Sequence, residues 1–108
     1  FRMMDGSAGE DFKKAVALDI SAGGMKIAVP DQIREGESLL VAFDLPVKTG
    51  VHSFELETRV MRSSIPDKGT GNIFHLGLLF TDITNFQRDI IFNYIFNRMA
   101  ELRREGKA

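Results

Sequence analysis

The sequence predicts an all-β domain, a six-stranded antiparallel β-barrel that is closed by one long C-terminal helix. As far as Phe80 the sequence consists of short runs of alternating apolar and polar residues. Such alternation is typical of half-buried strands. Residues that favour turns separate these runs at short intervals. After Thr84 the apolar residues recur about every 3.6 positions, which is the period of an α-helix. We therefore expect a single domain, with the barrel at about 1–81 and the helix at about 84–105.

The first two strands are predicted at 1–4 and 12–20, with an exposed, turn-rich loop at 5–10 between them. In the second strand one side is apolar, and we expect that side to be buried; its residues are Phe12, Val16, Leu18 and Ile20. Asp19 and Ser21 then share the outward face, because residues two apart in a strand point the same way.

Four further strands complete the predicted barrel, and each places its apolar residues on the inward side. These inward residues are Met25, Ile27 and Val29, then Leu39, Val41, Phe43 and Leu45, then Phe54, Leu56, Thr58 and Val60, and finally Phe74, Leu76, Leu78 and Phe80. A turn-rich loop at 66–72 separates the last two strands. A closed barrel of this kind has no free strand edges to protect.

The C-terminal helix is expected to begin at a capping box, because Thr84 and Gln87 stand at the required spacing. Its apolar arc is wider than one barrel can bury, with Phe92 and Phe96 toward a second side. We therefore expect part of the helix to contact a second copy of the chain, an upstream domain or a partner protein.

Composition excludes several classes of function. The net charge is −1, so the chain lacks the basic surface of a general nucleic-acid-binding protein. It has no Cys, and its two His residues have no partner at metal-ligand spacing, so we expect neither a metal nor a cofactor. No apolar run approaches the roughly 20 residues of a membrane-spanning helix. An oligonucleotide-binding barrel is set aside, because the outward residues include Glu55, Glu57 and Asp44 and few aromatic rings.

The segment at 19–24 is the most informative part of the sequence. It places Asp19 and Ser21 just ahead of the pair Gly23 and Gly24. We expect the glycines to turn the chain with positive φ and to leave backbone N–H groups open to a ligand. The pattern D-x-S-x-x-G, with apolar strands on both sides, resembles the signature of PilZ domains, which are bacterial receptors for the second messenger cyclic di-GMP.

The resemblance extends along most of the chain. His75–Phe80 looks like the last barrel strand of the family, and Asn93–Arg98 is similar to the closing helix of its flagellar-brake branch, in which a separate domain lies upstream. The family also has an R-x-x-x-R motif ahead of these strands, and no two arginines in this sequence stand four residues apart. Phe1–Met4 resembles the end of the family's first strand, so we expect the arginine motif to lie upstream of Phe1.

The resemblance implies a ligand site for cyclic di-GMP in this segment. Asp19 is expected to accept the N1–H and N2–H₂ groups of a guanine. Ser21 is expected to donate its hydroxyl to a phosphate oxygen, with support from the N–H groups of Gly23 and Gly24. Arg59, on the outward face of the fifth strand, is an accessory candidate.

These residues also have structural interpretations. Asp and Ser ahead of a Gly pair are typical of a simple turn. For Arg59 the favoured interpretation is pairing with Glu57 or Glu55 across a strand. Gly77 either leaves space for a ligand, because it has no side chain, or leaves space for the helix to pack against the strand. The packing interpretation is favoured.

The function that the resemblance implies is that of a cytoplasmic bacterial receptor, not an enzyme. Ligand binding on the outer barrel face is expected to order the upstream segment and to act on a neighbouring domain or partner that controls motility, exopolysaccharide production or virulence. Without the arginines, these 108 residues alone are expected to bind weakly. The alternative is a PilZ-like scaffold that binds no nucleotide and acts through Phe92 and Phe96. A hydrolase that uses Ser21 and His75 is not expected, because no Gly-x-Ser-x-Gly motif is present.

Overall fold

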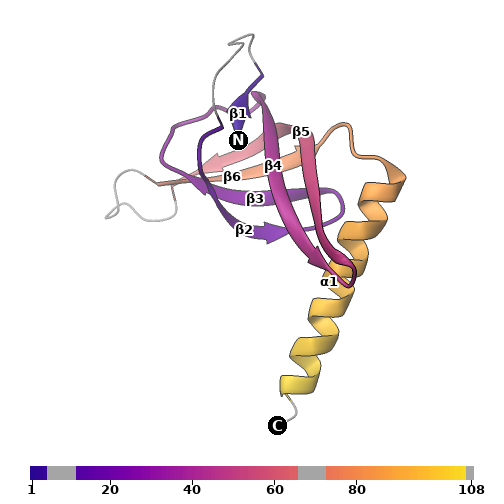
Figure 1. Cartoon of the computed structure of the whole chain (residues 1–108). Helices are drawn as coiled ribbons and strands as arrows, with labels where there is room; N and C mark the ends of the chain where they lie inside the picture. The colour runs from indigo at the N-terminus through magenta and orange to yellow at the C-terminus, as the bar shows by residue number, and fades with distance from the viewer. Residues whose placement is uncertain (5–11, 66–72, 107–108) are drawn as a thin grey trace.

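The computed structural model describes residues 1–4, 12–65 and 73–106. In this part of the chain six strands form one antiparallel sheet, which is followed by a helix. The elements are β1 (Arg2–Met3), β2 (Val16–Ile20), β3 (Gly24–Val29), β4 (Ser38–Val47), β5 (Gly50–Ser64), β6 (Phe74–Phe80) and α1 (Asn85–Gly106). Figure 1 shows the sheet curled into a half-barrel with α1 beside it. The predicted fold class is confirmed, whereas the loops predicted at 5–10 and 66–72 lie outside the described residues.

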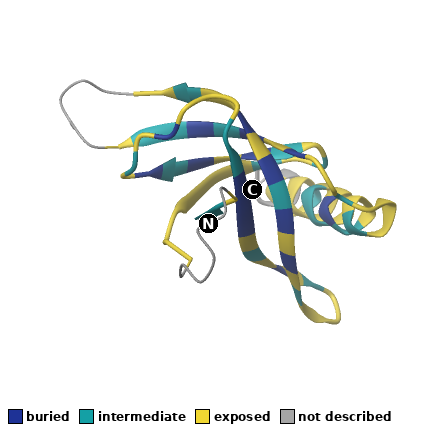
Figure 2. Cartoon of the chain, turned by 90° about the horizontal axis from the view of Figure 1, so that it is seen from above, coloured by how far each residue is buried: buried dark blue, intermediate teal, exposed yellow. Residues whose placement is uncertain are grey.

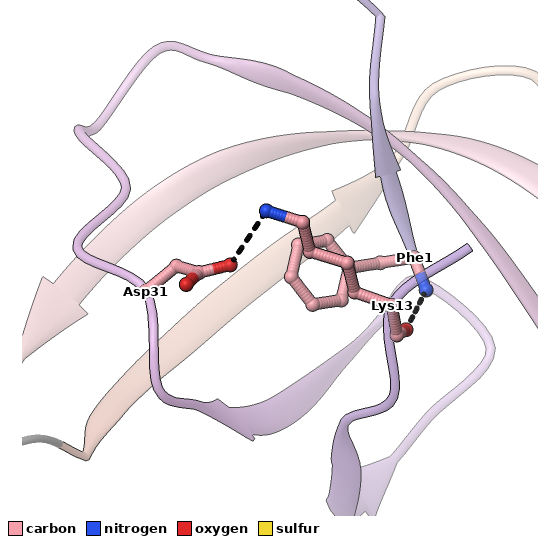
Figure 3. Close-up of polar contacts among 3 residues, drawn as sticks. All are labelled: Phe1, Lys13 and Asp31. Carbon is pink, nitrogen blue, oxygen red and sulfur yellow. Dashed lines mark hydrogen bonds and ion pairs between the residues drawn. The ribbon is translucent and has the colours of Figure 1, made fainter. Parts of the chain in front are cut away.

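The two edges of the curled sheet meet at one place. The strand order β1-β4-β5-β6-β3-β2 leaves β1 and β2 at opposite edges. Just ahead of these strands, Phe1 and Lys13 exchange two backbone hydrogen bonds of 2.7 Å. Figure 3 shows the bond from the Phe1 nitrogen to the Lys13 carbonyl, and the Lys13 ammonium 3.3 Å from the Asp31 carboxylate. Within the described residues β1 and β2 do not pair, so the half-barrel differs from the edgeless barrel that the alternation alone predicts.

The core lies inside the curled sheet and consists largely of the inward residues predicted for β3 to β6 (Figure 2). Leu39 and Leu76 are fully buried, as predicted. Phe43 and Phe74 are partly buried and pack against the same cluster. Thr58 is 1% exposed, and its hydroxyl donates a 3.0 Å hydrogen bond to the Leu39 carbonyl. This bond explains how a threonine is accommodated among apolar side chains, because its one polar group is satisfied.

The inward face predicted for the second strand is wrong at three of its four residues, whereas Ile20 packs against the core as predicted. Three of its four apolar residues are exposed: Phe12 at 44%, Val16 at 63% and Leu18 at 44%. A β-bulge between Ala17 and Asp19 shifts the pairing of β2 with β3 by one residue. Ahead of the bulge Ala17 stands opposite the buried Ile27, and beyond it Ile20 stands opposite the buried Met25. A one-residue shift exchanges the two faces of a strand, so simple alternation across the bulge fails.

The helix α1 begins with the predicted capping box. The Gln87 N–H donates to the Thr84 hydroxyl at 3.1 Å, and the Thr84 N–H donates to the Gln87 amide oxygen at 3.0 Å. Ile91, which is 0% exposed, anchors the helix in the core. Figure 1 shows the C-terminal half of the helix projecting beyond the sheet, and Phe92 and Phe96 are 61% and 65% exposed. No helix in the described part of the chain has an apolar stretch long enough to cross a membrane.

Candidate functional site

A tight hairpin turn at Ser21–Gly24 joins β2 to β3. The Ser21 N–H donates a 2.8 Å hydrogen bond to the Gly24 carbonyl, which closes the turn. The Ser21 hydroxyl oxygen accepts from the N–H groups of Gly23 at 3.3 Å and Gly24 at 3.2 Å. The same hydroxyl donates to the Gly24 carbonyl at 3.2 Å. The serine thus organises the turn, and the N–H groups of Gly23 and Gly24, which are expected to face a ligand, donate to its oxygen.

Asp19 lies on the exposed outer face of β2, opposite Lys26 of β3. One of its carboxylate oxygens accepts a 2.9 Å hydrogen bond from the Ile20 N–H, which holds the side chain close to the backbone. No described residue lies within ion-pair distance of this carboxylate. Because an ionised carboxylate has about four acceptor positions, most of its accepting capacity remains for a ligand.

The two glycines of the hairpin have different roles. A Cβ on Gly24 would overlap the Leu78 carbonyl oxygen, so β3 can approach β6 this closely only with glycine at this position. A Cβ on Gly23 would meet no atom within 4 Å. The expected positive φ at these glycines is wrong, because in the described residues positive φ occurs at Gly36 and Gly50. The requirement at Gly24 is therefore close contact between strands and not a left-handed turn.

The hairpin borders a shallow depression of about 330 Å³ on the outer face of the sheet. All four predicted ligand-binding residues line it, namely Asp19, Ser21, Gly23 and Gly24. Met61 of β5 and Leu79 of β6, which are 55% and 45% exposed, line it from the other side. Apolar surface beside a carboxylate and a hydroxyl suits a ligand that combines flat rings with polar groups.

A row of paired residues crosses the outer face at this depression. Asp19 of β2 pairs with Lys26 of β3, which pairs in turn with Gly77 of β6. Gly77 pairs on its other side with Arg62 of β5. Lys26 and Gly77 face outward, because the residues on either side of each are buried. Arg62 is also exposed, and its Cβ would lie 3.5 Å from a Cβ on Gly77, so the two positions share a face.

The family model of the PilZ domain matches residues 4–97 of this sequence. The chain belongs to the PilZ domain family. No curated protein and no solved structure matches it. PilZ domains form a family of cyclic di-GMP receptors and are ligand-binding domains, not enzymes. The depression beside the D-x-S-x-x-G hairpin is therefore the candidate receptor site of this PilZ domain.

Arg59 of this PilZ domain lies on β5, two residues before Met61, which lines the depression. It pairs with Leu79, whose side chain lines the depression, and it is exposed. Within the residues that the structure describes, neither Glu55 nor Glu57 lies within ion-pair distance of Arg59. The structure thus places Arg59 near the candidate site but outside its lining, and its accessory role stays a prediction.

Gly77 lines the depression in the PilZ domain, and no described atom of the helix would lie within 4 Å of a Cβ at this position. A Cβ at this position would meet the Arg62 Cβ alone within 4 Å, at the ordinary contact distance of 3.5 Å. The interpretation that Gly77 relieves packing beneath the helix is therefore wrong. Its effect is to keep the surface low between Lys26 and Arg62.

The residues considered for hydrolysis are separated in this PilZ domain. Ser21 lies in the β2–β3 turn, whereas His75 pairs with Ala28 near the other end of β3. The stretch from Gly24 to Ala28 spans roughly 13 Å of extended chain. The described part of the chain also contains no group of three His, Cys, Asp or Glu side chains arranged to hold a metal ion.

Proposed function

We propose that this PilZ domain is the cyclic di-GMP receptor module of a bacterial cytoplasmic protein, and that it binds its ligand in the depression beside the β2–β3 hairpin. The observation that supports this most directly is the position of Asp19. Its exposed carboxylate stands at the border of the depression, within the family's D-x-S-x-x-G segment, and no described residue neutralises it.

The Asp19 carboxylate suits one edge of guanine. Guanine presents its N1–H and N2–H₂ donors side by side, and the two oxygens of a carboxylate can accept both. Such charge-assisted hydrogen bonds are shorter and stronger than neutral ones. The existing bond from the Ile20 N–H limits the rotation of the side chain, so less entropy is lost when the guanine binds.

The Ser21 hydroxyl is prepared to donate to a phosphate oxygen. Its present acceptor is the Gly24 carbonyl oxygen, at a long distance of 3.2 Å. That oxygen also accepts a hydrogen bond from the Ser21 N–H. Turning the hydroxyl hydrogen toward a ligand therefore leaves no buried group unpaired. The N–H groups of Gly23 and Gly24 donate to the hydroxyl oxygen, which strengthens it as a donor.

The negative charge of the ligand suggests how binding is transmitted to an upstream domain. Cyclic di-GMP carries two negative charges and Asp19 adds a third, so tight binding requires several cations. An upstream R-x-x-x-R segment that becomes ordered over the bound ligand supplies them and couples binding to the position of an upstream domain. We expect this coupling to control motility, exopolysaccharide production or virulence, with flagellar-brake control as the specific form.

The substitution Asp19→Ala is expected to weaken cyclic di-GMP binding by about 1–3 kcal/mol, because the guanine donors lose a charged acceptor. Affinity is measured from backbone amide NMR shifts during titration, a method that reaches dissociation constants in the millimolar range and so suits the chain as it stands. Thermal unfolding of each variant confirms that the fold is retained.

The matched control is Asp44→Ala. Asp44 is an exposed carboxylate on β4 that pairs with Ser53 and does not line the depression, so its loss changes the net charge equally. Affinity is expected to be unchanged in this variant. Equal affinities for Asp19→Ala and Asp44→Ala would show that Asp19 only supports the turn.

Protein association through α1 is a second candidate function, because Phe92 and Phe96 are largely exposed on the helix. In this alternative the domain is a scaffold that binds no nucleotide, or it forms a homodimer through the helix. Sedimentation equilibrium of the wild-type chain and the Phe92→Ser/Phe96→Ser variant tests the dimer. A monomeric wild-type chain at high concentration would exclude it.

A further inference from the structure

The row of residues that crosses the depression contains two cationic side chains, those of Lys26 and Arg62, on either side of Gly77. We propose that Lys26 and Arg62 together bind one phosphate group of the cyclic dinucleotide above Gly77. This inference rests on the proposed function, because it names the side chains that hold the phosphate of the same ligand in the same depression.

The positions of the two cations suit a shared anion. Lys26 and Arg62 are the partners of Gly77 on its two sides, in β3 and β5. Adjacent strands lie about 4.8 Å apart, so the two Cα atoms are about 10 Å apart. Both side chains are long and flexible enough to converge on a phosphate centred over the glycine, with the Arg62 guanidinium as the planar donor and the Lys26 ammonium as the point charge.

Gly77 provides the space for that phosphate. The packing of the protein itself does not require glycine here, because a Cβ would make only an ordinary 3.5 Å contact with Arg62. Glycine inside a strand weakens the strand and often marks a place where a ligand approaches the backbone closely. The contrast with Gly24 is direct, since a Cβ on Gly24 would overlap a carbonyl oxygen.

The charges of the two side chains remain available for a ligand. Both residues are exposed, and no described acidic residue lies within ion-pair distance of either. Asp19, although it stands opposite Lys26 in the sheet, does not reach it. Asp19 and Gly77 are two strands apart, about 10 Å, which is comparable to the span from the guanine edge to the phosphate of one nucleotide. One guanosine phosphate unit thus fits along the row.

The test compares the affinities of Lys26→Ala and Arg62→Ala for cyclic di-GMP by amide NMR titration. Each substitution is expected to weaken binding about tenfold, because each removes a charge-assisted hydrogen bond to the phosphate. Lys26→Arg keeps the charge and is expected to keep the affinity within about twofold. Gly77→Ala is expected to weaken binding without lowering the unfolding temperature, because the added methyl group occupies the phosphate position and makes only an ordinary 3.5 Å contact with the Arg62 Cβ.

The control variant is Lys48→Ala, which removes one exposed cation in the turn between β4 and β5 and leaves the depression intact. Its affinity for cyclic di-GMP is expected to equal that of the wild-type chain.

Guanosine, which has no phosphate, separates this inference from the proposed function. The binding of guanosine is expected to weaken in Asp19→Ala and to persist in Lys26→Ala. If Asp19→Ala weakens cyclic di-GMP binding while Lys26→Ala and Arg62→Ala match Lys48→Ala, the inference is overturned and the proposed function stands. If the wild-type chain binds no cyclic di-GMP, both are overturned.

Discussion

A chain in which an R-x-x-x-R segment precedes Phe1 is expected to bind cyclic di-GMP more than about a hundredfold more tightly than these 108 residues alone. Each arginine contributes charge-assisted hydrogen bonds to the ligand, and a hydrogen bond to a charged group contributes roughly 1.5–3 kcal/mol. Two such residues therefore add roughly 3–6 kcal/mol. In the shorter chain Lys26 and Arg62 still contribute to binding, so a weak affinity for cyclic di-GMP is expected to remain. Calorimetry at high protein concentration can measure it.

The control for this comparison is an extended chain in which both arginines of the added motif are replaced by alanine. It has the same length as the extended chain and keeps the barrel surface, so it separates the charges from any contact made by the extra backbone. Its affinity is expected to return to that of the shorter chain. If the shorter chain binds as tightly as the extended one, the hairpin and its neighbours suffice, and the account of the arginines is wrong.

Gly24→Ala is expected to lower the free energy of unfolding by about 2–3 kcal/mol, because the new methyl group overlaps the Leu78 carbonyl oxygen. That oxygen belongs to the backbone of β6, which cannot move without disturbing the pairing of β3 with β6. Gly23→Ala is the matched control, since a Cβ there meets nothing within 4 Å and its φ is not positive. It is expected to change stability by less than about 0.5 kcal/mol.

Urea unfolding followed by circular dichroism measures both glycine variants. A shift of the midpoint in Gly24→Ala alone supports the close contact of β3 with β6. Equal midpoints for the two variants would mean that the strands separate at little cost, and that the glycine at position 24 serves the ligand instead of the fold.

Local sequence signals predict much of this fold. The alternation in β3 to β6 correctly assigns residues such as Leu39 and Leu76 to the core, because each of these strands has one face against it. The capping box at Thr84 also forms as predicted, because its two partners are only three residues apart. In β2 the alternation wrongly assigns Val16 to the core, because the bulge after Ala17 shifts the strand by one residue. The bulge arises from the pairing with β3 and cannot be recognised from the alternation of β2 itself.

One part of the candidate site can be recognised from the sequence, and the other part cannot. Asp19 and Ser21 are recognisable because the D-x-S-x-x-G segment is contiguous, and all of it lines one depression. The row formed by Lys26, Gly77 and Arg62 draws on three strands, and its register depends on a second bulge near Val60. Register between strands distant in sequence follows from tertiary packing. The alternation therefore places Lys26 between two inward residues, Met25 and Ile27, but does not show which residues stand beside it.

The most direct test of the receptor site is to map the backbone amides that shift when cyclic di-GMP is added to the wild-type chain. The site proposed here predicts that the largest shifts cluster at residues 19–26 and at Gly77, with smaller ones at Met61 and Leu79. A separate hollow between the β4–β5 hairpin and α1, lined by His52, Phe86 and Tyr94, serves as the internal comparison. Shifts concentrated at that hollow, or no shifts at millimolar ligand, would contradict a binding site at the β2–β3 hairpin.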